Sequence, residues 1–284
     1  MRGPIAVVTT FGLGRTPAQV GMIEELQGRG LAADFVVGTS LGAINAAALA
    51  AGDTSGLRSF WGWVHEEILG SPIRAIAKSM TGVQARKQEA ALRKAVEALL
   101  PGAFPTNLQL VATDLDTGNE VELSQGRLVD AVLASAALPG VLSPIEINSA
   151  QLFDGGLVAG MPLRIVPDAA KTVIVLDTGH SAVTPEVADG YRWWEVGALA
   201  YAHLIRGQAV NALAHAGRKR TVVVLSTDSG RLLDFSDPVA AMDSGRHVAA
   251  AQLDGLPSRP RRGIYGLPSG LEQFEVLQDL IQSD

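Results

Sequence analysis

The chain has 284 residues, of which 47% are hydrophobic and 18% charged, so it can bury a large core and lies near the upper size of one α/β domain. Its formal net charge of −6 disfavours nucleic acid and other polyanions as partners. The absence of cysteine excludes disulfides, thiolate zinc sites and iron–sulfur clusters.

The first elements of the chain predict a βαβ unit. Residues 4–10 have the pattern of a strand, 17–29 that of an amphipathic helix, and 34–38 that of a second strand. Such a unit implies parallel strands and a right-handed crossover, with functional loops at the carboxyl ends of the strands. Both Phe11–Thr16 and Ser40 fall at such ends. We therefore expect these two segments to be neighbours.

The rest of the chain contains both helices and strands. Residues 56–100 are helical in pattern, and Arg86–Leu100 is a well-formed helix that ends at Pro101-Gly102. The elements expected after it are strands at Leu108–Thr113 and Glu120–Leu123, a short helix at Val129–Ala137, a hairpin of Pro144–Ile147 with Gln151–Phe153, strands at Thr172–Leu176 and Thr221–Leu225 around a long helix at Trp193–His215, a loop-like tail beyond Leu256, and a short helix near Leu271–Ile281. No repeat, linker or break in composition marks a second domain, so we expect one domain over 1–284, with core motifs in 4–180 and an elaboration in 181–284.

The segment Phe35–Leu49 carries the strongest chemical signal. An apolar strand runs through G-x-S-x-G into an alanine-rich helix, which is the layout of a nucleophile elbow. Gly38 and Gly42 flank Ser40, because crowding at such a sharp turn requires small residues two positions either side of the nucleophile. The alternative is a tight turn whose serine only caps the helix. The strand before the motif and the helix after it favour Ser40 as a nucleophile.

A serine nucleophile needs a general base. A histidine base in the chain order of α/β-hydrolases is disfavoured, because their elbow follows several strands and this one follows the second. No histidine lies in a motif; the nominal candidates are His180, His203, His215 and His247. Asp154 is the better candidate, since it ends an apolar strand and precedes Gly155-Gly156, which allow a turn of unusual φ. Taken alone, this D-G-G sequence is also explained by a type I′ or II′ turn.

Four segments together resemble the bacterial patatin-like phospholipases, which are serine acyl hydrolases with a Ser–Asp dyad. In order and separation over residues 4–180, the matching segments are Gly38–Ala43, Val111–Gly118, Ala134–Val141 and Phe153–Leu157. The resemblance implies a three-layer α/β/α fold with a mainly parallel central sheet, and it places the dyad on Ser40 and Asp154. It also implies that no metal or organic cofactor is required. Asp154 would take the proton of Ser40, which attacks an ester and forms an acyl-enzyme that water hydrolyses.

The family's oxyanion loop, G-G-G-x-R-G, falls on Phe11–Thr16, where only Gly12 and Arg15 keep the family's residues. Backbone N–H groups form such a hole, so the resemblance assigns it to Gly12, Leu13, Gly14 and Arg15. Side chains at Phe11 and Leu13 restrict φ and crowd the approach of substrate. Ala159-Gly160 is a second departure, at a place where the family often has asparagines.

We expect a hydrolase that acts on carboxylic esters, of which phospholipids and lysophospholipids are the leading class. Two alternatives remain open: an acyltransferase that uses the same dyad, and a non-catalytic acyl-binding relative with an altered oxyanion loop. Nucleotide binding through Gly12-Leu13-Gly14 is disfavoured because G-x-G-x-x-G is incomplete at Pro17. The expected partners are a lipid or acyl-ester substrate and, transiently, a membrane surface.

The uncharged run 35–52 is long enough for a membrane span, but a buried strand and helix explain it. The amino terminus has no signal-peptide pattern, and we expect a cytoplasmic protein with peripheral membrane contact. Residues 56–100 and 181–215 are expected to form the pocket wall. For four tryptophans, core packing is favoured over lipid contact; these are Trp61, Trp63, Trp193 and Trp194. Turn formation explains Asp114 and helix packing explains Ser135.

Overall fold

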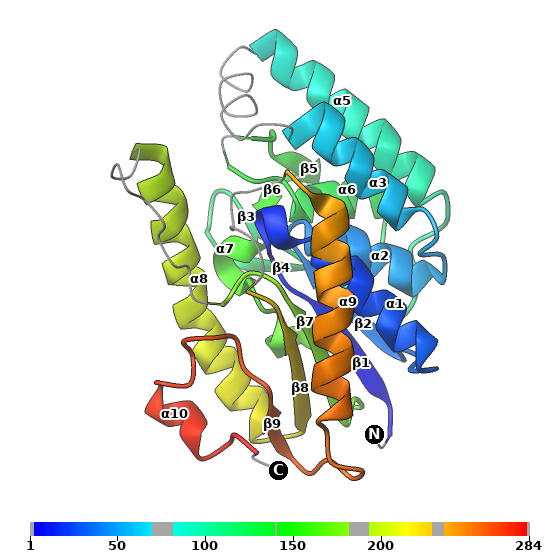
Figure 1. Cartoon of the computed structure of the whole chain (residues 1–284). Helices are drawn as coiled ribbons and strands as arrows, with labels where there is room; N and C mark the ends of the chain where they lie inside the picture. Colours follow the sequence, from blue (N-terminus) through cyan, green and yellow to red (C-terminus); the bar gives the residue numbers. More distant parts are fainter. Residues whose placement is uncertain (1–2, 70–81, 140, 182–192, 229–235, 283–284) are drawn as a thin grey trace.

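The computed structural model describes residues 3–69, 82–139, 141–181, 193–228 and 236–282 (Figure 1). Within these residues, one sheet contains nine strands, which follow one another in the order β5-β6-β3-β2-β1-β7-β8-β9, with β4 paired to β3. Their bounds are β1 Ile5–Thr9, β2 Phe35–Thr39, β3 Leu108–Asp114, β4 Glu120–Leu123, β5 Ile145–Ile147, β6 Ala150–Asp154, β7 Thr172–Asp177, β8 Thr221–Ser226 and β9 Gly263–Tyr265.

The central part of the sheet is parallel. The pairs β1–β2, β1–β7, β2–β3, β7–β8 and β8–β9 are all parallel, whereas β4, β5 and β6 join by antiparallel pairing at the β3 side. Parallel neighbours need long crossovers, and helices supply them here. The mainly parallel α/β sheet expected from the sequence is confirmed, and so is the hairpin of β5 and β6.

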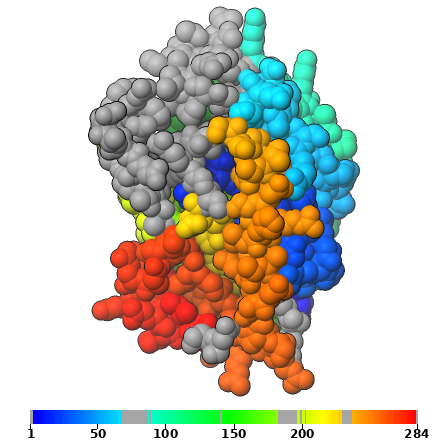
Figure 2. Space-filling model, in the orientation of Figure 1, coloured from blue at the N-terminus to red at the C-terminus, as the bar shows by residue number. Residues whose placement is uncertain are grey.

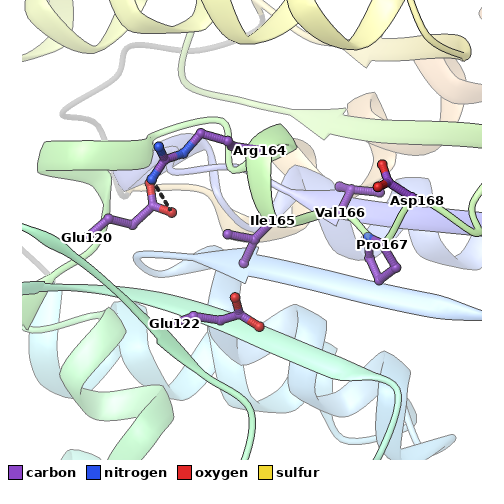
Figure 3. Close-up of a pocket in the computed structure, with 7 residues that line it drawn as sticks. All are labelled: Glu120, Glu122, Arg164, Ile165, Val166, Pro167 and Asp168. Atoms are coloured by element: carbon purple, nitrogen blue, oxygen red, sulfur yellow. Dashed lines mark ion pairs between the residues drawn. The ribbon is translucent and has the colours of Figure 1, made fainter.

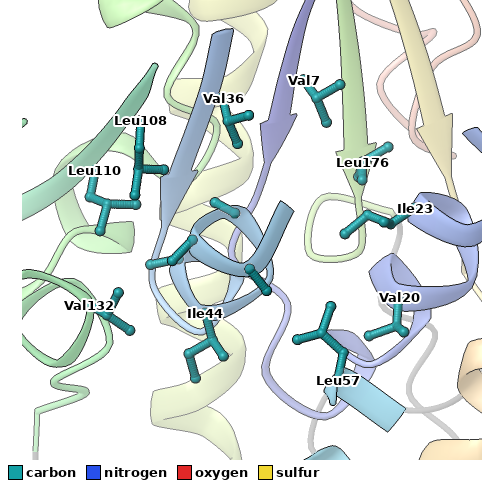
Figure 4. Packing of buried hydrophobic residues seen from close by; sticks show 14 of the residues in the cluster. Val7, Val20, Ile23, Val36, Ile44, Leu57, Leu108, Leu110, Val132 and Leu176 are labelled. Atoms are coloured by element: carbon teal, nitrogen blue, oxygen red, sulfur yellow. The ribbon is translucent and has the colours of Figure 1, made fainter. Parts of the chain in front are cut away.

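Helices cover both faces of the sheet. On β1, Val7 packs into one apolar cluster, while Ala6 and Val8 pack into another, because alternate residues of a strand point to opposite faces. The first cluster joins the sheet to α1 (Ala18–Gly28), α2 (Gly42–Ala51), α3 (Leu57–Trp63), α6 (Leu128–Ser135) and α9 (Pro238–Asp254), as Figure 4 shows in part. The second joins it to α8 (Trp193–Gly217) and α10 (Glu275–Gln278). The three-layer arrangement is therefore confirmed (Figure 1).

The remaining helical segments are short or peripheral. The helix α5 (Gly82–Leu99) lies outside α3 and α6, and η2 (Val64–Leu69) continues α3 as a π-helix. Three short turns complete the described helices: η1 (Leu13–Arg15), α7 (Gly156–Ala159) and η3 (Leu163–Ile165). No helix in the described ranges is long and apolar enough to cross a membrane.

Two elements near the carboxyl end differ from the sequence expectation. The helix α9 was not predicted, yet it packs closely along α1 and forms a continuous ridge in Figure 2. Glycines permit this approach: a Cβ at Gly21 would lie 1.8 Å from Met242 O, and one at Gly245 would lie 2.0 Å from Ala18 O. The strand β9 falls in the tail that was expected to be loop, so that expectation is wrong there. It forms because the edge of β8 offers unpaired backbone groups.

Candidate active site

Ser40 lies at the turn between β2 and α2, in a left-handed backbone conformation with φ +55°. This region is costly for a residue with a side chain, and it is typical of strained functional turns. The flanking glycines are required by space. A Cβ at Gly38 would lie 2.5 Å from Ala46 Cβ, and a Cβ at Gly42 would lie 2.4 Å from Thr10 O. The sequence G-T-S-L-G therefore folds as a sharp strand-to-helix turn.

Ser40 and Asp154 meet because two strands end at consecutive residues of β3. Thr39, the last residue of β2, pairs with Val111, and Asp154, the last residue of β6, pairs with Ala112. Both strands lie on the same edge of β3, since β4 pairs with Val111 and Ala112 along the other edge. The residue after Thr39 therefore arrives beside Asp154, although the strands approach from opposite directions.

The two side chains are hydrogen-bonded and buried. Ser40 Oγ donates to Asp154 Oδ2 at 2.7 Å, and the exposed fractions are 1% for Ser40 and 0% for Asp154. The other carboxylate oxygen, Oδ1, accepts from Gly156 N at 2.7 Å and from Tyr201 OH at 3.4 Å. Burial raises the pKa of Asp154 from 3.8 to about 6, although the hydrogen bonds from Ser40, Gly156 and Tyr201 oppose this rise. A carboxylate of this kind is a stronger proton acceptor than one in water.

The paired glycines after Asp154 are required because there is no room for a side chain, and not because the backbone adopts a positive φ. Gly155 has an ordinary helical conformation (φ −71°) and caps α7, and Gly156 is not among the residues with positive φ. The expected turn of unusual φ, and the type I′ or II′ alternative, are therefore wrong. A Cβ at Gly155 would lie 2.1 Å from Val111 O, and one at Gly156 would lie 2.7 Å from Asp154 Oδ1. The backbone passes too close to β3 and to the carboxylate for any side chain.

The loop Phe11–Thr16 is the neighbour of the elbow, as expected: Asn45 Nδ2 of α2 donates to Thr16 O at 3.3 Å, and Thr9 Oγ1 at the end of β1 donates to Gly42 O at 2.8 Å. Leu13 adopts φ +47°. The family motif G-G-G-x-R-G has glycine at this position. The backbone N–H of Arg15 donates within the loop to Gly12 O at 2.9 Å. The N–H of Arg15 is thus engaged, and Gly12, Leu13 and Gly14 are the better candidates for oxyanion donors.

The Arg15 side chain is buried, with 5% of its surface exposed. Burial lowers its pKa, and the negative charges of Asp177 and Asp228 partly oppose that effect. This environment of carboxylates favours a role for the Arg15 side chain in holding the loop.

Of the nominal histidine bases, His180 is buried at the end of β7. Its Nδ1 lies 2.5 Å from Asp177 Oδ1, and its ring packs edge-on against Phe11 at a centroid distance of 5.2 Å. Burial raises the pKa of Asp177, but His180 and the hydroxyls of Ser226 and Thr10 outweigh this effect and hold that pKa below its ordinary value. His180 is therefore engaged in a second buried network, and the other three histidines (His203, His215 and His247) are exposed.

The sequence interpretation of two further residues is confirmed. Asp114 Oδ1 accepts from the N–H groups of Asp116 and Thr117 and so forms a turn. Trp61 is 2% exposed and donates to Asn45 Oδ1 at 2.8 Å, so it is a core residue. Ser135 is buried in α6, but helix packing alone does not account for it, because its Oγ accepts from Ser40 N and donates to Val111 O. The side chains of Trp193 and Trp194 lie outside the described part of the chain, as do 70–81 and 182–192 of the expected pocket wall.

An apolar cluster contacts Asp154 through Tyr201. It joins Phe11 and Leu13 to Tyr201 and Ile205 of α8, with Leu138 beside them. Sequence reasoning predicted α8 but missed Tyr201 and Ile205 as site residues. Their i, i+4 spacing puts both on one face of the helix, but no motif identifies that face as the one above Asp154.

A separate open hollow of about 550 Å³ lies at the outer strands (Figure 3). Charged residues from β4 and η3 face it, including the ion pair of Arg164 with Glu120 at 3.3 Å. None of the candidate site residues lines it. Within the described residues, no group of three or more His, Cys, Asp or Glu side chains is placed to hold a metal ion.

The fold and the site define an α/β protein with a serine–carboxylate pair at the strand ends of a mainly parallel sheet. A family model described as patatin-like phospholipase matches residues 12–167, and the chain belongs to this family.

Its relatives extend the comparison. An uncharacterized NTE family protein of Mycobacterium tuberculosis is 31% identical over 183 residues, which cover 63% of this chain and 50% of that protein. A second one from the same organism is 30% identical over 188 residues, which cover 63% of this chain and 31% of that protein. The chain therefore spans half or less of the length of these relatives. Among solved structures, VipD from Legionella pneumophila aligns over 89% of this chain and 67% of its own, with a TM-score of 0.48 and 13% identity.

Proposed function

We propose that this chain is a serine acyl hydrolase that cleaves carboxylic ester bonds of lipids through Ser40 and Asp154. The observation that carries the proposal is the 2.7 Å hydrogen bond from Ser40 Oγ to a fully buried carboxylate whose pKa burial raises to about 6. Membership of the patatin-like phospholipase family supports lipids as the substrate class.

The chemistry follows from the two side chains. Asp154 takes the proton of Ser40 Oγ while Oγ bonds to the ester carbonyl carbon. The protonated carboxyl then gives this proton to the departing alcohol oxygen, which leaves an acyl group on Ser40. Water attacks the acyl-enzyme, Asp154 takes a proton from the water, and it returns the proton to Ser40 as the fatty acid departs. Backbone N–H groups at the start of α2 and in Gly12–Gly14 are the candidate donors to the tetrahedral oxyanion.

The first experiment is intact-mass labelling of the purified protein with a fluorophosphonate. We expect one adduct on the wild type, none at that site in Ser40→Ala, and labelling of Asp154→Asn that is slower by about 10²–10⁴-fold, the usual size of a general-base effect. Absence of labelling on the wild type would favour the non-catalytic acyl-binding relative.

The chain offers a matched control for this experiment. Ser55 Oγ also donates to an aspartate, Asp53 Oδ1, at 2.7 Å, but this pair is exposed and hydrogen bonds from Ser55 lower the pKa of Asp53. Ser55→Ala should label like the wild type.

If Ser40 reacts, a second assay separates hydrolysis from acyl transfer. The protein is incubated with lipid esters, with and without an added small alcohol. A hydrolase releases the free acid, whereas a transferase forms a new ester with the alcohol.

A further inference from the structure

The helix α8 supplies a second contact to Asp154 from outside the family-matched segment. Tyr201 lies beyond residues 12–167, and its OH donates to Asp154 Oδ1 at 3.4 Å. Gly156 N donates to the same oxygen at 2.7 Å, while Oδ2 accepts from Ser40. One carboxylate oxygen is thus held by the protein framework and the other meets the hydroxyl of the serine.

The approach of α8 depends on glycines that follow Asp154. Gly156 faces Tyr201, and Gly160 faces Ile205. The two glycines are four residues apart in the sequence, and so are Tyr201 and Ile205. A Cβ at Gly156 would lie 3.0 Å from Tyr201 OH, and a Cβ at Gly160 would lie 2.0 Å from Ile205 Cγ2. The second contact would displace Ile205, so side chains on α7 would push α8 away from Asp154. The short helix α7 is therefore shaped to let the phenol reach the carboxylate.

The Tyr201 hydroxyl stays protonated and so acts as a hydrogen-bond donor to Asp154. Burial raises the pKa of Tyr201, and so do the charge of Asp154 and the hydrogen bond to it. The hydroxyl therefore keeps its proton throughout the range in which Asp154 ionises. The ring also packs edge-on against Phe11, with a centroid distance of 6.1 Å and an interplanar angle of 88°. The imidazole of His180 packs on Phe11 too, but it bonds to Asp177.

We propose that Tyr201 is a positioning residue of the active site, whose hydroxyl orients the Asp154 carboxylate so that Oδ2 faces Ser40. The inference rests on the proposed function and deepens it. It also gives the segment after residue 181 a part in the chemistry, through a single hydroxyl on α8.

The test is Tyr201→Phe, which keeps the ring and removes the hydroxyl. A hydrogen bond to a carboxylate favours its charged form, so its loss should raise the pKa of Asp154 further. Titration of ¹³C-labelled aspartate by NMR, with the Asp154 signal assigned from Asp154→Asn, should show an upward shift of about half to one pH unit. Tyr265→Phe is the matched control, because Tyr265 is buried in β9 and its OH accepts from Arg261 N at 2.7 Å. It should leave the Asp154 titration unchanged.

A second readout separates this inference from the hydrolase proposal. The pH profile of fluorophosphonate labelling should move upward with the pKa of Asp154, so that Tyr201→Phe labels about two- to five-fold more slowly at pH 6. An Asp154 titration that is identical in Tyr201→Phe and wild type would overturn the inference, whatever the labelling shows. A shifted titration in a protein that never labels would support the Tyr201 contact and count against the hydrolase. Tyr201→Met, which is also apolar and lacks the hydroxyl, gives the same test if the phenylalanine variant does not fold.

Discussion

The hydroxyl of Ser135 holds the strained backbone of Ser40. Ser40 N donates to Ser135 Oγ at 3.1 Å, and Ser135 Oγ donates in turn to Val111 O at 2.6 Å. Both serines are buried, with 1% of Ser40 and 0% of Ser135 exposed. This bridge ties the elbow to β3 at Val111, which precedes Ala112, the residue that pairs with Asp154.

Ser135→Ala should therefore destabilise the protein. It leaves the buried N–H of Ser40 and the buried carbonyl of Val111 without this partner, at a cost of about 1–3 kcal/mol. Urea unfolding measures the loss. Ser143→Ala is the control, because Ser143 Oγ donates to Glu89 at an exposed position. Equal stability of the two variants would show that the bridge contributes nothing.

The reaction of Ser40 should depend on pH through Asp154. Only the ionised carboxylate can take the proton, and burial raises its pKa to about 6. The labelling rate should rise with pH to a plateau, with a midpoint near that value. Rates of fluorophosphonate labelling from pH 4.5 to pH 8.5 measure the midpoint. A midpoint near the ordinary carboxyl pKa would mean that the site is more hydrated than its burial indicates.

The same burial links stability to pH. The folded-state pKa of Asp154 lies above its ordinary value of 3.8, so ionisation is harder in the folded protein. The stability conferred by the neutral carboxyl is complete below about pH 4 and is lost as the pH rises through about 6. The full loss is about 3 kcal/mol for a shift of this size.

Asp154→Asn removes that loss. The free energy of unfolding of this variant minus that of the wild type should therefore increase as the pH rises from 4.5 to 8. Urea unfolding at each pH measures both values. Asp114→Asn is the control with the opposite sign. Hydrogen bonds from Thr117 lower the pKa of Asp114, so its replacement should cost more at neutral than at acid pH. A stability difference for Asp154→Asn that does not change with pH would contradict the raised pKa.

The sequence predicted those features that a local pattern controls. The elbow at Ser40 and the first βαβ unit follow from apolar runs, glycines and helix periodicity within about 50 residues. Asp154 was a candidate from its strand end and the following glycines, but only the resemblance to a family paired it with Ser40, because that pairing depends on two strands that end at adjacent residues of β3. That register is a property of the assembled sheet.

Tyr201 shows the limit of this reasoning. It lies 47 residues after Asp154, in a helix whose periodicity predicts a helix but does not say what it packs against. The contact requires α8 to settle on Gly156 and Gly160, and those glycines look like turn residues in the sequence. Their role became clear only from the space around them. Sequence reasoning missed Tyr201 and expected an unusual φ at Gly155-Gly156 because both depend on long-range packing, which no local pattern shows.

Leu13 offers a test of backbone strain in the candidate oxyanion loop. It has φ +47° and is 5% exposed, so it combines an unfavourable conformation with a buried side chain. Replacement by alanine removes the packing and keeps the strain, whereas replacement by glycine removes both. Because glycine adopts positive φ without penalty, Leu13→Gly should be more stable than Leu13→Ala by about 1 kcal/mol.

Alanine is usually the more stable replacement than glycine, and Leu26 is a position in the same protein where this usual order is expected. Leu26 is 2% exposed and lies within α1, where glycine is worse than alanine by about 1 kcal/mol. Urea unfolding of the four variants gives two differences that should have opposite signs. If glycine is also the worse residue at position 13, the loop does not hold Leu13 in the left-handed conformation. Its backbone N–H groups would then point elsewhere than assumed for an oxyanion hole.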